Sequence, residues 1–191
     1  VEERGRFYEP TGALRDMVPN HLFQLLTMVA MEPPGAFDAE AVRDEKTKLV
    51  TAIRPVTPEN AVRGQYAAGH EDGKEVPAYR DEPDVSKESR TETYAALKLE
   101  IENPRWSGVP FYLRTGKRMA GRRTEIAVHF KAPSLPLFRG AAADGIAPNV
   151  MRLRIDPEPG SATRLNVKRP GPQMHLAAIE TGFRYADFFD P

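Results

Sequence analysis

The chain has 191 residues, of which 40% are hydrophobic, so it can build a substantial core as one domain or as two small ones. Its 27 basic and 27 acidic residues cancel, so bulk charge gives no argument for a nucleic acid or an anionic membrane as partner. The chain has no cysteine, which excludes a disulfide framework and thiolate chemistry and fits a reducing compartment.

The stretch from residue 12 to residue 31 predicts the longest amphipathic helix. Its apolar side chains recur at steps of three and four: Leu14, Val18, Leu22, Leu25 and Val29. Thr11 is the expected N-cap, and Pro33 and Pro34 end the helix. Pro19 lacks a backbone N–H and crowds the carbonyl of Arg15, so we expect a kink there.

A second helix follows, between segments without clear periodicity. Residues 1–11 are predicted to form a loop or a short strand. Asp38 is the expected N-cap of a helix that runs to about Ile53. Residues 55–90 are rich in Gly, Pro, Asp and Glu, so we expect a long irregular connection. The longest apolar run, residues 22–31, is about half the roughly 20 residues that a membrane span needs.

From residue 94 the hydrophobic period changes to two, which is typical of half-buried strands. The alternation predicts about six strands, near residues 94–101, 109–113, 126–130, 151–155, 165–167 and 174–180. Helices followed by strands indicate an α+β domain with helices packed on one face of a large, mainly antiparallel sheet. Residues 1–191 then divide into a helical part (about 10–54), the irregular connection (about 55–90) and a sheet part (about 91–185).

His21 is the first candidate for chemistry. A neutral imidazole can accept a proton from a hydroxyl near physiological pH, and such a base contributes roughly 10²–10⁴ in rate. The alternative is a helix histidine that is satisfied by a neighbouring carbonyl. Asp16 precedes His21 by five positions, about 140° around a straight helix, so spacing alone does not make the two a dyad. The alternative for Asp16, which the sequence alone favours, is a surface carboxylate near a helix start, where the helix dipole stabilises it.

Two groups of cations are candidates for holding an anion. The run from Arg114 to Arg123 contains five cations and two glycines, which suits a sugar phosphate or a nucleotide. The alternative is a solvated hairpin turn between two strands. A second group lies on the polar side of two predicted strands: Arg152, Arg154, Arg164 and Lys168. If these strands pair, the cations form a stripe, although an ordinary wet sheet face explains them equally well. The histidines show no metal-ligand spacing.

Three longer motifs follow one another along the chain. They are Gly-Ala-Leu-Arg-Asp-Met-Val-Pro-Asn-His-Leu at 12–22, Val-Arg-Gly-Gln-Tyr at 62–66, and Trp-Ser-Gly-Val-Pro-Phe-Tyr-Leu-Arg-Thr-Gly-Lys at 106–117. With Lys-Arg-Pro-Gly-Pro at 168–172, they resemble the C-terminal domain of glucose-6-phosphate dehydrogenase over essentially the whole chain. The resemblance implies an oxidoreductase of the pentose phosphate pathway that oxidises glucose 6-phosphate at C1 to 6-phosphogluconolactone and passes hydride to NADP.

The resemblance also implies roles for single residues. His21 would be the general base, Asp16 would hold sugar hydroxyls, and Lys117 and Arg122 would face the substrate. Some members bind a second, structural NADP, and the positions similar to its phosphate-binding cations are Arg114, Arg123, Arg154 and Arg164. The chain departs from the family pattern at three positions: Pro19 and Asp156 each stand where a glutamine is found, and Ala162 replaces an aromatic residue that helps to hold the structural nucleotide.

Other features of the family are not found in these 191 residues. They are the Rossmann domain and an Asp-His-Tyr-Leu-Gly-Lys segment whose carboxylate orients the base. We therefore expect a single truncated domain for substrate binding and oligomerisation that is inactive by itself, and the first residue, which is not methionine, agrees with an excised piece. A cytoplasmic homodimer formed through the sheet is expected, with no nucleic acid or membrane partner. The alternative is a non-catalytic module that binds a sugar phosphate or nucleotide, or that only dimerises.

Overall fold

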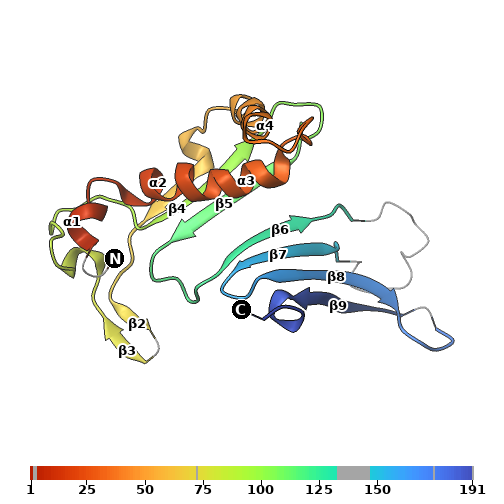
Figure 1. The fold of residues 1–191 in the computed structure, drawn as a ribbon. Helices are drawn as coiled ribbons and strands as arrows, with labels where there is room; N and C mark the ends of the chain where they lie inside the picture. The colour runs from red at the N-terminus through yellow and green to blue at the C-terminus, as the bar shows by residue number, and fades with distance from the viewer. Residues whose placement is uncertain (2–3, 72, 133–146, 174, 191) are drawn as a thin grey trace. The chain divides into compact units, whose positions relative to one another are not determined.

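The fold comes from a computed structural model, which describes residues 1, 4–71, 73–132, 147–173 and 175–190 (Figure 1). The chain forms two compact units, Val1–Ala120 and Gly121–Pro191. The first unit combines helices with two antiparallel sheets, and the second contains one antiparallel sheet. The predicted α+β class is therefore confirmed. None of the helices in these residues is long and apolar enough to span a membrane.

Three helical segments replace the single long helix predicted for residues 12–31. They are α2 (Gly12–Asp16), a π-helical turn η2 (Val18–Leu22) and α3 (Phe23–Ala30). The π turn takes the place of the expected kink, because a wider turn accommodates the missing N–H of Pro19. The Thr11 side chain does not cap α2, since its hydroxyl donates to the carbonyls of Phe7 and Tyr8.

The remaining helices show one correct and one wrong prediction. Helix α4 (Ala39–Thr51) begins after Asp38, whose carboxylate accepts hydrogen bonds from the N–H groups of Glu40 and Ala41, as its N-cap role requires. Residues Gly5–Tyr8 form the short helix α1 in place of the predicted loop or strand.

The sheets of the first unit use two predicted strands and three that the sequence did not reveal. The order β1 (Ala61–Gly64), β4 (Tyr94–Glu100), β5 (Pro110–Gly116) forms one sheet, and β2 (Gly69–Glu71) pairs with β3 (Lys74–Val76). The 3₁₀ turns η3 (Pro58–Asn60) and η4 (Tyr79–Asp81) also fall in the stretch 55–90, which is therefore less irregular than predicted.

Helices α3 and α4 pack on one face of the β4–β5 pair. Leu26, Ala30 and Leu49 from the helices meet Leu99 and Ile101 from the sheet side. Burying these side chains removes apolar surface from water, which is the main stabilising contribution of such a core. The core fixes α3, and through the continuous helical segments it also fixes η2 and α2.

The second unit contains the other four predicted strands. They form an antiparallel sheet in the order β6 (Thr124–His129), β7 (Val150–Asp156), β8 (Gly160–Lys168), β9 (Leu176–Arg184), followed by the 3₁₀ turn η6 (Tyr185–Asp187). The strand predicted at 174–180 begins with Met174, which lies outside the described residues. Strand β5 pairs with β4 and β6 pairs with β7, so the basic run between β5 and β6 is not a hairpin turn.

Candidate functional site

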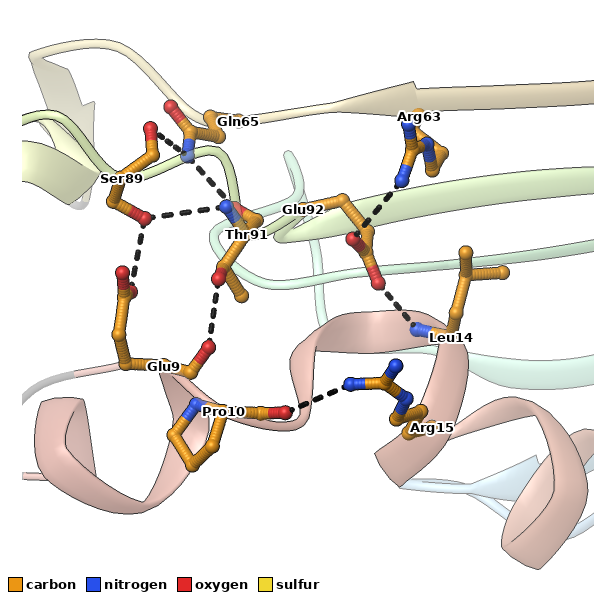
Figure 2. A network of polar contacts seen from close by, with 9 residues as sticks. All are labelled: Glu9, Pro10, Leu14, Arg15, Arg63, Gln65, Ser89, Thr91 and Glu92. Carbon is orange, nitrogen blue, oxygen red and sulfur yellow. Dashed lines mark hydrogen bonds and ion pairs between the residues drawn. The ribbon is translucent and has the colours of Figure 1, made fainter.

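A network of polar contacts holds the segment before α2 against the residues that lead into β4 (Figure 2). The Thr91 hydroxyl donates to the carbonyl of Glu9 at 2.7 Å. The Gln65 amide donates to the carbonyls of Ser89 and Thr91 at 3.1 and 2.7 Å. These bonds join segments that are far apart in the sequence, and they fix where α2 begins.

Glu92 provides the cap that Thr11 was expected to provide. Its carboxylate accepts from the N–H of Leu14 at 2.9 Å, and its carbonyl accepts from the N–H of Ala13 at 2.9 Å. Gly12 permits this approach, because it has a φ of +64° and because a Cβ there would lie 2.5 Å from Glu92 Oε1. The buried Glu92 thus satisfies two donors at the start of the helix that carries Asp16.

The π turn η2 carries His21 and directly follows the helix that carries Asp16. The N–H groups of His21 and Leu22 both donate to the carbonyl of Met17, at 3.0 Å each. The Asn20 amide donates to the carbonyl of Asp16 at 3.1 Å. The side chain of His21 is exposed and Asp16 is half-buried. Because the turn is wider than an α-helical one, the angle calculated for a straight helix does not describe how these two residues are related.

Tyr8 interacts with two of the predicted substrate-binding residues. The Lys117 ammonium sits over the Tyr8 ring, 5.5 Å from its centroid. Burial, followed by the negative charges of Asp16 and Glu92, raises the pKa of the Tyr8 hydroxyl. The ring is 3% exposed. Within the first unit, Lys117 therefore contacts this buried ring, and the charge of Asp16 acts on its hydroxyl.

The cations of the basic run have different environments. The Lys117 backbone N–H donates to the carbonyl of Thr93 at 2.9 Å, which ties the end of β5 to the sheet. Arg118 has a φ of +51°, and its guanidinium lies 3.2 Å from the buried carboxylate of Glu82. Arg122 belongs to the second unit, where it forms an exposed ion pair with Asp156 at 2.9 Å. Of this run, Lys117 is the cation that lies over the Tyr8 ring.

The predicted cationic stripe exists on the second unit, but an acidic residue lies in it. Strands β7 and β8 pair as expected, and Arg152 and Arg154 project from the same face as Arg164. Glu180 on β9 lies directly opposite Arg164 and sits 3.6 and 3.5 Å from the guanidinium groups of Arg152 and Arg154. The stripe is therefore partly neutralised.

The other two residues predicted to bind the structural NADP lie in different units. Arg114 lies on β5 in the first unit, and Arg123 is an exposed residue of the second unit. Ala162 lies buried on the face of the arginines, between Gly160 and Arg164 along β8. Within the described ranges, no group of three His, Asp or Glu side chains could hold a metal ion.

Sequence reasoning missed Tyr8 and Glu92. Tyr8 falls in the segment predicted as a loop or strand, and Glu92 lies 78 positions from the Leu14 N–H that it caps. The glycine at position 12 was a signal, because a glycine at a helix start permits a positive φ and a close approach of another group. It did not indicate that Glu92 is the group that approaches.

The fold and the polar site together define an α+β domain with a helix-borne carboxylate, an exposed histidine and a lysine beside a buried ring. The family profile described as "Glucose-6-phosphate dehydrogenase, C-terminal domain" matches residues 1–191. The chain belongs to this family.

Individual relatives agree with this assignment. Glucose-6-phosphate 1-dehydrogenase of Aggregatibacter actinomycetemcomitans is 48% identical over 98% of this chain and 38% of its own length. The enzyme of the same name from Bacillus subtilis (strain 168) is 46% identical over 96% of the chain and 38% of its own length. A solved glucose-6-phosphate dehydrogenase in complex with its substrate glucose 6-phosphate superposes with a TM-score of 0.87, at 34% identity, over 97% of this chain and 37% of that one. The chain thus spans about two fifths of the length of these relatives.

Proposed function

We propose that this chain supplies the general base and part of the substrate site of an enzyme that oxidises glucose 6-phosphate at C1 to the lactone, with NADP as hydride acceptor. Family membership supports the reaction, and the solved relative whose substrate is glucose 6-phosphate supports the substrate. The fold that binds NADP is expected outside these residues, so the proposal assigns this chain the base and the substrate contacts alone.

Each residue has one task in this proposal. The imidazole of His21 accepts the proton of the C1 hydroxyl as the C1–O bond becomes a carbonyl. NADP, when bound, would supply the oxidising chemistry by accepting the hydride of C1. The carboxylate of Asp16 accepts hydrogen bonds from sugar hydroxyls, and the ammonium of Lys117 donates to substrate oxygens. The substrate contact that the family resemblance implies for Arg122, a residue of the second unit, stays a prediction.

The observation that supports this proposal most is the arrangement around Tyr8. The Lys117 ammonium lies over this buried ring, the charge of Asp16 raises the pKa of its hydroxyl, and the exposed His21 follows Asp16 on the π turn. Opposite charges that form no ion pair with each other in the described structure can each bind a different part of a polar, anionic substrate.

The test is His21→Ala in the full-length protein. We expect the turnover number to fall by roughly 10²–10⁴ while the KM for glucose 6-phosphate changes little, because a proton acceptor and not a binding group is lost. His70→Ala, at an exposed position on β2, is the matched control and should keep its turnover. Near-normal turnover of His21→Ala would favour a structural histidine or a non-catalytic binding module.

We do not extend the proposal to a second, structural NADP. Glu180 already lies against Arg152 and Arg154 and opposite Arg164, and a carboxylate there repels phosphate groups. Ala162 provides no ring on which a base or nicotinamide could stack. The residues of the second unit therefore do not fit this group.

We propose a homodimer formed through the sheet of the second unit. Ile155, Ile179 and Phe183 project from the face opposite the arginines and are 38%, 46% and 44% exposed. Exposed apolar side chains that share a sheet face are typical of an interface. Ile179→Asp should convert a dimer to monomers in analytical ultracentrifugation, and an unchanged mass would contradict this interface.

We also propose that residues 1–191 by themselves do not catalyse the reaction, because they span about two fifths of the length of active relatives. Incubation of this chain with glucose 6-phosphate and NADP should give no NADPH above the background rate. Robust NADPH production would refute this.

A further inference from the structure

A polar cavity lies at the start of α2, on residues that the proposed substrate site does not use. It has a volume of about 310 Å³, within the range of small-ligand sites. Its walls come from the segment before α2, from β1 and from the residues that precede β4, all within the first unit (Figure 2). Three arginines line it: Arg15, Arg63 and Arg90.

The three guanidinium groups have most of their donors available. Arg15 donates one hydrogen bond, from Nη1 to the carbonyl of Pro10 at 3.1 Å. Arg63 is 63% exposed and stands 3.9 Å from Glu92, beyond hydrogen-bond distance. Arg90 is exposed, and its side chain forms no hydrogen bond or ion pair with any residue in the described part of the chain. Since a guanidinium has five N–H donors, this cavity offers many unused ones.

The two carboxylates that line the cavity are held by other partners. Glu9 accepts hydrogen bonds from the hydroxyls of Tyr79 and Ser89, at 2.6 and 2.9 Å. Glu92 is buried and accepts from the N–H of Leu14. Both carboxylates are thus hydrogen-bonded to groups other than the arginines, and Glu92 also forms an ion pair with Arg63 at 3.9 Å. Three arginines against two glutamates leave the lining with a net positive charge.

We propose that this cavity is a binding site for a small oxyanion, in particular a phosphate group. The planar fork of an arginine donates two parallel hydrogen bonds to phosphate oxygens, and Arg15 and Arg90 provide two such forks from different segments of the lining. Arg63 adds positive charge at the exposed rim. The ligand is bound by Arg15, whereas the next residue, Asp16, belongs to the proposed substrate site, so the two sites use different side chains of one short helix.

The experiment measures binding of inorganic phosphate to the full-length protein by calorimetry at constant ionic strength. Lys117→Gln and Arg122→Gln are introduced first, so that phosphate cannot bind to the cations of the proposed substrate site. In this background Arg15→Gln and Arg90→Gln should each weaken phosphate binding at least tenfold, because each removes a charge-assisted fork. Arg43→Gln, an exposed arginine of α4 far along the chain from the cavity residues, is the matched control and should bind as the background does.

Equal affinities of Arg15→Gln, Arg90→Gln and Arg43→Gln would overturn the proposal. Arg90 is exposed and its side chain has no hydrogen bond or ion pair to lose among the described residues, so its variant tests binding even where Arg15→Gln disturbs folding. If glycerol 3-phosphate competes with inorganic phosphate, the ligand is a phosphate monoester. If it does not compete, the ligand is free phosphate. Either result supports an oxyanion site. The readout is binding and not turnover, so a negative result leaves the role proposed for His21 untouched.

Discussion

Replacing Tyr8 with leucine should weaken substrate binding, whereas replacing it with phenylalanine should not. The Lys117 ammonium lies 5.5 Å from the centroid of the Tyr8 ring, within the range of a cation–π interaction. Such a contact contributes about 0.5–1 kcal/mol at exposed sites and about 2 kcal/mol when desolvated. Lys117 is half-buried, so we expect a loss of about 1 kcal/mol in Tyr8→Leu. This corresponds to about a fivefold increase in the KM for glucose 6-phosphate.

Phenylalanine separates the ring from the hydroxyl. The Tyr8 hydroxyl is buried and has no hydrogen-bond partner among the described residues. An unsatisfied buried polar group costs about 1–3 kcal/mol, so Tyr8→Phe should raise the free energy of unfolding by about 1 kcal/mol. It retains the ring beneath Lys117 and should keep the KM of the parent. Stability and KM thus move independently in the two variants.

The assay combines steady-state kinetics with urea unfolding of the full-length protein. Tyr8→Leu in a Lys117→Gln background should no longer change the KM, because the contact is already lost, and the double-mutant cycle measures the coupling. A KM increase in Tyr8→Phe equal to that in Tyr8→Leu would refute the role of the ring. Equal effects of Tyr8→Leu with and without Lys117 would show a purely structural role.

Three further predictions concern stability. Glu92→Ala should lower the free energy of unfolding by about 1–3 kcal/mol, because it leaves the N–H of Leu14 without its acceptor, and Glu92→Gln should lower it less; urea unfolding measures both. Asp38→Ala should lower stability by about 1 kcal/mol through loss of the N-cap of α4, read as a lower melting temperature, while Asp44→Ala inside α4 should have little effect. Burial, and for Tyr79 also its hydrogen bond to Glu9, raises the pKa of Tyr8 and Tyr79, so the folded state holds these protons more tightly than the unfolded chain. Stability should therefore be constant up to about pH 10 and fall above it in urea titrations, and a stability that stays flat up to about pH 11.5 would contradict this.

Features set by near neighbours in the sequence could be predicted. Asp38 caps the helix that begins one residue later, and the period-two alternation locates all six strands from β4 to β9. In each case the interacting groups are within a few residues of one another, or the pattern depends only on which face of a strand is buried. The short strands β1, β2 and β3 have three or four residues, too few for such a pattern to be recognised.

The contacts that build the site are different, because they join distant segments. Thr11 is a good N-cap by residue type, but its hydroxyl bonds to carbonyls of α1, and Glu92 approaches α2 from 78 positions away. Local preference is overridden here by a tertiary contact that the positive φ of Gly12 permits. Pro19 correctly indicated a break in the helix, since it lacks an N–H, but it did not indicate that the break takes the form of a π turn.

The acidic residue in the cationic stripe shows why strand register limits sequence reasoning about charge. Alternation turns Arg154 and Arg164 away from the apolar sides of their own strands, and the pairing of β7 with β8 places both on one face. Whether β9 adds charge or an apolar side chain opposite Arg164 depends on its register with β8, which places Glu180 there. A shift of one residue would bring Ile179 opposite Arg164 and turn Glu180 to the other face. The stripe would then keep its full charge. The β8–β9 connection sets the register, because the Arg169 N–H donates to the carbonyl of His175 at 2.7 Å. The charge of this face therefore depends on that connection.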